Sequence, residues 1–218
     1  MKDLIIVGAG GFGREIAWLS ERMNEASPTW NLLGFIDDNP DFKGKMIGGY
    51  SVLGGCGVSS EYPNAWYVCA IGCAVVRRKI VQKINSLIPA RYATLIDPST
   101  LISKRVSVGE GCIICAGNII TTDITIGNHV IVNLDCTIGH DAIIEDFVTL
   151  YPSVNVSGTT TINSCTEIGT GAQIIQGRRI ESNTIIGAGA VVVDDIRKPG
   201  IYIGVPARFL KATNNGDR

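Results

Sequence analysis

The stretch that decides the fold is residues 108–144, VGEGCIICAGNIITTDITIGNHVIVNLDCTIGHDAII, and its pattern continues to residue 192. An aliphatic residue recurs at every sixth position: Val108, Ile114, Ile120, Ile126, Val132, Ile138, Ile144, Leu150, Val156, Ile162, Ile168, Ile174, Ile180, Ile186 and Val192. A helix cannot hold this series on one face, because six residues advance it by about 600°. An extended chain can, because an even step returns to the same side and β-branched residues favour strands. Short strands wound repeatedly over one core predict a hexapeptide-repeat parallel β-helix.

The residues around these repeat positions predict tight corners. Small or aliphatic residues mostly stand two positions before each repeat position and share its inward direction. The inward positions also include Asn118 and Arg178, and we expect Arg178 to turn outward or to find an acidic partner. Glycine or asparagine directly follows several repeat positions, at Gly109, Gly127, Asn133, Gly139, Asn163, Gly169 and Gly187. We expect these residues to supply left-handed backbone at the corners.

Composition narrows the function classes. The 218 residues carry nineteen basic and twenty acidic side chains, a net charge of −1, which gives no electrostatic case for nucleic acid or an anionic membrane. No apolar run approaches the ~18–20 residues that a membrane span needs, and the N-terminus lacks the pattern of a signal peptide. Seven cysteines, an odd number without framework spacing, favour thiols in a reducing compartment. A cytoplasmic protein is expected.

The first ninety residues predict a small α/β domain. An apolar strand at 4–7 ends in the glycine-rich turn Gly8-Ala9-Gly10-Gly11-Phe12-Gly13, a helical segment follows, and a strand at 32–36 ends in Asp37-Asp38. Strand, glycine turn, helix and strand with a terminal acid are typical of dinucleotide-binding folds, in which the helix N-terminus faces an anion. The alternative is a purely structural turn. With a third strand at 66–71 and a second helix, residues 1–90 form a half-Rossmann domain that could hold one nucleotide moiety, and residues 91–218 form the β-helix domain.

Two groups of basic residues are expected to be exposed. Arg77, Arg78, Lys79 and Lys83 are interpreted as one solvated helix face, with phosphate contact as the alternative. His129 follows a turn without an acidic neighbour, and we expect it at the surface. The polar residues 213–218 are expected to fray.

One corner of the β-helix carries the candidate catalytic residues. Three repeats make one coil of eighteen residues, so residues eighteen apart stack at about 4.8 Å and Thr122, His140, Gly158 and Gln176 form one column. His140 follows a turn glycine and is no core residue, Asp141 can orient it, and Gly158 leaves room for a ligand and a backbone N–H. A base near neutral pH beside a free backbone donor suits acyl transfer. The alternative is a solvated turn histidine.

The combination of motifs resembles one family over nearly the whole chain. Val7–Glu15, Gly34-Phe35-Ile36-Asp37-Asp38, Ala70-Ile71-Gly72, Ile138-Gly139-His140-Asp141 and Gly204-Val205-Pro206-Ala207-Arg208 are similar to the bacterial sialic acid O-acetyltransferase and nucleotide-amino-sugar N-acetyltransferase family. The resemblance implies a left-handed β-helix, a homotrimer with sites between subunits, acetyl-CoA as cosubstrate and a nucleotide-sugar in the N-terminal domain.

The resemblance also implies roles for individual residues. His140 and Asp141 match the catalytic base and its acidic partner. The nucleotide-linked amino sugar is expected at Gly10, Gly11, Phe12, Asp37, Asp38, Gly72 and Asn133, and acetyl-CoA at Thr149, Gly158, Gly169, Ala188, Gly204, Pro206 and Arg208. Two departures stand out: Thr149 replaces a second histidine of the acetyl-CoA site, and Asp97-Pro98 replaces a His-Pro pair at the entrance to the β-helix.

These observations predict an acetyl-CoA-dependent N-acetyltransferase that acts on the amino group of a nucleotide-linked amino sugar, with His140 as general base. The main alternative is O-acetylation of a sugar of the sialic acid type at the same site. Two further functions stay open, a nicotinamide-dependent oxidoreductase and a scaffold without catalytic activity. No metal is predicted, because no Cys, His and acidic cluster has ligand spacing.

Overall fold

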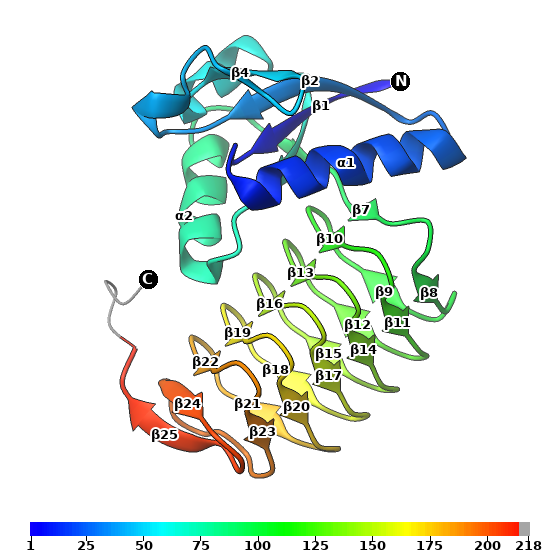
Figure 1. Ribbon diagram of the computed structural model, residues 1–218, viewed down its shortest axis with the longest axis vertical. Coiled ribbons are helices and arrows are strands. Elements are labelled where there is room, and N and C mark those ends of the chain that lie inside the picture. Colours follow the sequence, from blue (N-terminus) through cyan, green and yellow to red (C-terminus); the bar gives the residue numbers. More distant parts are fainter. Residues whose placement is uncertain (214–218) are drawn as a thin grey trace.

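The computed structural model describes residues 1–213 as an α/β domain that lies on one side of a three-faced parallel β-helix (Figure 1). The tail that we expected to fray, residues 213–218, lies outside the described residues apart from Thr213. Within the described part of the chain, neither helix is both long and apolar enough to cross a bilayer.

The N-terminal domain is a twisted sheet flanked by two helices. Its elements are β1 (Lys2–Val7), α1 (Gly11–Ala26), β2 (Trp30–Ile36), the 3₁₀ helix η1 (Pro40–Phe42), β3 (Met46–Ile47), β4 (Tyr50–Gly54), the 3₁₀ helix η2 (Cys56–Glu61), β5 (Trp66–Cys69), α2 (Ala74–Asn85) and β6 (Arg91–Tyr92). The strand order is β3-β4-β2-β1-β5-β6, and all neighbours are parallel except the β3–β4 hairpin. The predicted strand–turn–helix–strand unit is confirmed. The hairpin was not predicted, and β6 carries this sheet two residues beyond the expected boundary at residue 90.

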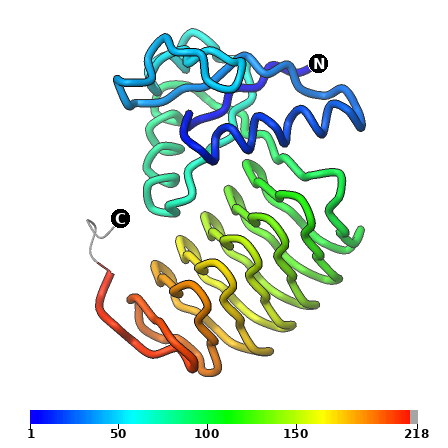
Figure 2. Tube along the Cα trace, viewed as in Figure 1, coloured from blue at the N-terminus to red at the C-terminus, as the bar shows by residue number. Residues whose placement is uncertain are grey.

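The β-helix consists of two-residue strands that stack into three flat faces, and it ends in the longer antiparallel pair β24 and β25. The strands are β7 (Leu95–Ile96), β8 (Leu101–Ile102), β9 (Ser107–Val108), β10 (Ile113–Ile114), β11 (Ile119–Ile120), β12 (Thr125–Ile126), β13 (Ile131–Val132), β14 (Thr137–Ile138), β15 (Ile143–Ile144), β16 (Thr149–Leu150), β17 (Asn155–Val156), β18 (Thr161–Ile162), β19 (Glu167–Ile168), β20 (Gln173–Ile174), β21 (Arg179–Ile180), β22 (Ile185–Ile186), β23 (Val191–Val192), β24 (Ile201–Ile203) and β25 (Arg208–Lys211). Face 1 holds β25-β24-β22-β19-β16-β13-β10-β7, face 2 holds β23-β20-β17-β14-β11-β8, and face 3 holds β21-β18-β15-β12-β9. The Cα trace shows these coils stacked along one axis (Figure 2).

The six-residue repeat predicted this core correctly. Each repeat position is the second residue of its strand, and nearly all are buried in one cluster inside the coils. The register pairs residues eighteen apart, as in Thr137 with Asn155 and Ile138 with Val156. Asn118 stays inside the coils, where its Nδ2 donates to the Cys115 carbonyl at 2.6 Å. Arg178 turns outward as expected, and its Nε donates to the Gln176 carbonyl at 3.2 Å.

The expectation of left-handed backbone directly after the repeat positions was wrong. Left-handed backbone occurs three residues after the repeat position, for example at Asp123, Asp141 and Gly171. The glycines that directly follow a repeat position are required by the closeness of the coils. A Cβ on Gly139 would lie 2.6 Å from the Gly158 nitrogen, and one on Gly169 would lie 2.6 Å from the Ala188 nitrogen.

The N-terminal domain covers face 1 from β7 to β19. Leu95, Ile113 and Ile131 of this face share a buried cluster with residues of α1 and the N-terminal sheet. At the start of the interface, Arg22 of α1 forms an ion pair with buried Asp97 at 2.7 Å. Although burial opposes it, hydrogen bonds from Arg22 and Ser99 lower the pKa of Asp97 to about 2.

Two residues expected at the surface are buried at this interface. The Arg77 side chain is 0% exposed, because it leaves the basic face of α2 and enters the junction between the domains. His129 is 4% exposed and stacks on Phe147 with ring centroids 4.9 Å apart. Burial, with a contribution from the Arg77 charge, lowers the pKa of His129 to about 4. Both expectations failed because sequence spacing does not show which exterior positions of the β-helix another domain will cover.

Candidate active site

The candidate catalytic residues meet at the edge between faces 2 and 3. His140 lies in the corner between β14 and β15, and its Nδ1 is 2.8 Å from Asp141 Oδ2. Asp141 has a φ of 58°, a left-handed conformation that aspartate tolerates, and its carboxylate reaches back to the preceding imidazole. This contact is solvent-accessible, with the histidine side chain 52% exposed. A proton on Nδ1 donates to Asp141 and leaves Nε2 as the acceptor.

Gly158 lies one coil further along the β-helix, and the His140 imidazole packs against it. A Cβ placed on Gly158 would lie 2.6 Å from His140 Nε2, so the ring occupies the space that the missing side chain leaves. The expected adjacency of His140 and Gly158 is therefore confirmed, although this space holds the imidazole itself and Gly158 is buried. Within residues 1–213, no group accepts a hydrogen bond from the Gly158 N–H. An imidazole whose Nε2 can accept a proton thus lies beside a backbone donor that no group of the described chain uses.

A recess lies at the ends of β1, β2 and β5 in the N-terminal domain. This cleft of about 330 Å³ is lined by five of the predicted nucleotide-sugar residues, Gly10, Gly11, Phe12, Asp37 and Asp38, with Ala70, Ile71, Cys56 and Ile80 among the others. Helix α1 begins at Gly11, and Gly10 provides no side-chain cap, so the first N–H groups point into the cleft unopposed. The helix packs closely on β1, because a Cβ on Gly13 would overlap the Gly8 carbonyl oxygen.

The two aspartates that end β2 already have protein partners. Asp37 accepts the Ala9 N–H at 2.8 Å and so holds the glycine turn. Asp38 accepts the Cys56 N–H at 2.8 Å and pairs with Lys83 at 2.7 Å. The Lys83 hydrogen bond lowers the pKa of Asp38. Each aspartate therefore shapes the cleft as well as lining it.

Three predicted site residues lie outside this cleft. Gly72 follows the cleft residue Ile71 but faces the β-helix, where its carbonyl accepts the Thr149 hydroxyl at 2.7 Å. Thr149 is 0% exposed, which is incompatible with a direct acetyl-CoA contact in this arrangement. Asn133 lies at the edge between faces 1 and 2, and its Oδ1 accepts the Leu134 N–H at 2.8 Å.

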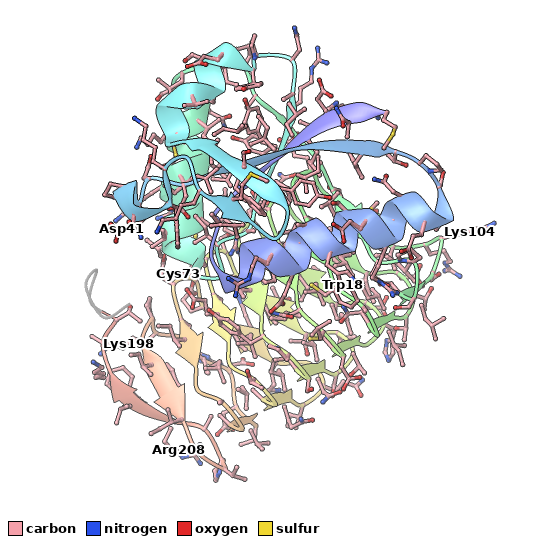
Figure 3. All side chains as sticks on the ribbon, turned by 45° about the horizontal axis from the view of Figure 1, so that its top comes forward. Trp18, Asp41, Cys73, Lys104, Lys198 and Arg208 are labelled. Atoms are coloured by element: carbon pink, nitrogen blue, oxygen red, sulfur yellow. The ribbon has the colours of Figure 1, made fainter. Side chains whose placement is uncertain are left out.

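The other residues expected to bind acetyl-CoA follow that same edge. Gly169 comes directly after face 1 strand β19, and Ala188 is the second residue after face 1 strand β22. The two residues stack, because a Cβ on Gly169 would lie 2.6 Å from the Ala188 nitrogen. Gly204 and Pro206 lie in the turn between β24 and β25, and Arg208 at the start of β25 is 3.4 Å from Asp194. Figure 3 shows Arg208 at the end of the β-helix remote from the N-terminal domain. Within one chain, face 2 separates this row from the edge that carries His140.

Sequence reasoning missed several residues of the domain junction. Arg77, Thr149, Tyr151 and Glu167 all contact the loop between β5 and α2. The outward strand and corner positions of Thr149, Tyr151 and Glu167 gave no signal of this contact, and neither did the helical position of Arg77. Across residues 1–213, no group of three His, Cys, Asp or Glu side chains is arranged to hold a metal ion.

Comparison with known proteins shows which family this sequence and fold resemble. Residues 3–84 match the model of the PglD N-terminal domain. The chain is 31% identical over 186 residues to GDP-perosamine N-acetyltransferase of Escherichia coli, covering 84% of this chain and 82% of that protein. PerB of Caulobacter crescentus, solved with CoA and GDP-perosamine, superimposes with a TM-score of 0.85 at 28% identity, covering 96% of this chain and 98% of PerB.

The acetyltransferase domain of PglB from Neisseria gonorrhoeae, solved with acetyl coenzyme A, is similarly close. Its TM-score is 0.85 at 28% identity, and the match covers 96% of this chain and 99% of that domain. Each of these relatives is an acetyltransferase. The chain therefore belongs to the hexapeptide-repeat family of nucleotide-amino-sugar N-acetyltransferases that includes GDP-perosamine N-acetyltransferase.

Proposed function

We propose that this protein transfers the acetyl group of acetyl-CoA to the amino group of a nucleotide-linked amino sugar. The observation that carries the proposal is the His140 imidazole, held by Asp141 at 2.8 Å and lying against Gly158. The cleft at the N-terminus of α1 supports a nucleotide diphosphate, because unopposed helix N–H groups favour anions. The choice of acetyl-CoA as donor and of a nucleotide-linked amino sugar as acceptor is supported by the ligands of the relatives named above.

His140 acts as the general base in this proposal. Nε2 accepts a proton as the neutral amine attacks the thioester carbonyl, and Asp141 stabilises the imidazolium that forms. The N–H of Gly158 donates to the oxyanion of the tetrahedral intermediate. When the intermediate collapses, the C–S bond breaks, the amide remains on the sugar, and the CoA thiolate leaves and takes a proton.

The position of His140 supports an active site shared between copies of the chain. The N-terminal domain with its cleft covers face 1, whereas His140 lies on the opposite edge of the three-faced prism, between faces 2 and 3. The cleft and the histidine of the same chain therefore lie on different sides of the β-helix. We propose a homotrimer in which each His140 acts on substrates bound by a neighbouring copy. That copy provides the cleft and the row of residues expected to bind acetyl-CoA, Gly169, Ala188, Gly204, Pro206 and Arg208, which we call the acetyl-CoA row. We also propose a cytoplasmic location, supported by the odd number of cysteines without framework spacing.

Thiol release tests the chemistry. The purified protein is incubated with acetyl-CoA and one of three acceptors: GDP-perosamine, a UDP-linked 4-amino sugar, or free sialic acid. We expect release with one of the nucleotide-linked amino sugars, and a loss of kcat of about 10²–10⁴ in His140→Ala with acetyl-CoA binding retained. Release with sialic acid alone would establish the O-acetyltransferase alternative. Full turnover by His140→Ala would remove the proposed base.

Subunit mixing tests the shared site. His140→Ala lacks the base but keeps its cleft, and Gly11→Asp places a negative charge where the diphosphate is expected but keeps its histidine. Each variant alone should be inactive. If the site lies between copies, refolding the two together should restore a fraction of the activity. If each chain is self-sufficient, the mixture should stay inactive.

A further inference from the structure

The buried guanidinium of Arg77 takes no part in the chemistry described so far. Arginine has five N–H donors in a rigid fork, and all of them are used here on main-chain carbonyl oxygens. Nε donates to His129 at 3.0 Å, Nη1 to Ile71 at 2.6 Å and Gly72 at 3.0 Å, and Nη2 to Phe147 at 2.9 Å and Val148 at 3.2 Å. A fully desolvated charge is costly unless every donor is satisfied, so this geometry is tightly specified.

The five carbonyls belong to two different domains. Ile71 and Gly72 lie in the loop between β5 and α2, and Ile71 lines the nucleotide cleft. The other three acceptors lie in two successive coils of the β-helix, at the edge between faces 3 and 1. One side chain therefore joins a wall of the cleft to the body that carries the acetyl-CoA row.

Other contacts hold the same loop from the β-helix. The Thr149 hydroxyl donates to the Gly72 carbonyl at 2.7 Å, and Glu167 accepts the Ala74 N–H at 2.9 Å. A Cβ on Gly72 would lie 3.3 Å from the Tyr151 hydroxyl, so the loop lies directly on that ring. Figure 3 shows Cys73, the last residue of this loop, at the end of α2 that lies next to the β-helix.

We propose that Arg77 is a positioning residue for the nucleotide-linked sugar. By fixing the carbonyls at 71 and 72 to the coils at 129 and 147–148, it sets where the cleft wall stands relative to the β-helix. This role rests on the proposed function, because the position of the wall matters only if a nucleotide in the cleft must deliver its sugar to a site on the β-helix. Acetyl-CoA, expected along the edge between faces 1 and 2, does not depend on this wall.

The test compares two Arg77 variants with a matched control. Arg77→Lys keeps the charge but has one nitrogen and cannot bridge both groups of carbonyls, and Arg77→Met removes the charge. We expect both to raise the KM for the nucleotide-linked amino sugar about tenfold or more while the KM for acetyl-CoA stays within about twofold. Hydrogen exchange in residues 70–76 should rise. Arg22→Met is the control: it breaks the interdomain ion pair with Asp97, and it should lower the Tm without changing either KM.

Several results would overturn the proposal. They are unchanged sugar KM values in both Arg77 variants, an equal rise of both KM values, or full rescue by lysine. If neither Arg77 variant folds, Thr149→Val removes only the hydroxyl contact to Gly72, and it should raise the sugar KM about fivefold. An unchanged KM in that variant would also overturn the proposal.

The two proposals fail in different ways. Calorimetry with GDP and with UDP measures occupancy of the cleft without turnover. A wild-type protein that binds one of them but acetylates no amino sugar refutes the proposed function. In that case, unaltered nucleotide affinity and unaltered exchange at 70–76 in the Arg77 variants would refute the positioning role separately.

Discussion

The contact between Gly158 and the His140 ring predicts that one added methyl group at Gly158 will lower the catalytic rate but leave the fold stable. In Gly158→Ala the new Cβ would stand 2.6 Å from Nε2 and 2.7 Å from Cε1, whereas ordinary contact begins at 3.4 Å. The exposed ring can move by the missing distance of about 1 Å without disturbing the coils. The φ of Gly158 lies outside the left-handed region, so alanine adds no backbone strain.

The expected effect is therefore kinetic. A displacement of about 1 Å in a reacting group costs roughly 10²-fold in rate, or about 3 kcal/mol of activation free energy. We expect kcat in the thiol-release assay to fall by about that factor, with little change in Tm. Gly57→Ala is the matched control, because its Cβ would meet nothing within 4 Å and its φ is also outside the left-handed region. Undiminished turnover in Gly158→Ala would refute the assignment of His140 as the base at this corner.

Three further predictions concern stability. The pKa of His129 is about 4 in the folded protein and 6.5 for the free side chain, so between these pH values only the unfolded chain binds a proton at this residue. The free energy of unfolding, measured by urea titration, should therefore fall by about 3 kcal/mol as the pH drops from 6.5 to 4. The fall should be smaller in His129→Gln. Asp97, with a pKa of about 2 against 3.8, contributes about 2 kcal/mol that is present above pH 3.8 and lost as pH falls to 2, and Asp97→Asn should lack this acid-induced loss. Gly13→Ala forces α1 away from the Gly8 carbonyl, so urea unfolding should show a loss of about 1–3 kcal/mol and calorimetry weaker nucleotide binding, whereas unchanged values would contradict the packing described.

The candidate site could be predicted wherever it follows the repeat. The six-residue period fixes three faces and stacks residues eighteen apart, so the adjacency of His140 and Gly158 follows from counting. The glycine-rich turn between an apolar strand and a helix likewise located the cleft, because its geometry is local. The period did not show why Gly139 is glycine, because closeness between coils is not visible in one strand.

The sequence by itself determined the β-helix, the half-Rossmann domain and the corner that carries His140, because each depends on spacing within a short stretch of chain. Only the tertiary structure decided what covers face 1. That contact buried Arg77 and His129, turned Thr149 from a ligand contact into a link to Gly72, and separated the cleft from the His140 edge. The physical reason is that an exterior position on a strand has the same local pattern whether water or another domain lies against it. Its burial is set by contacts between residues far apart in the chain.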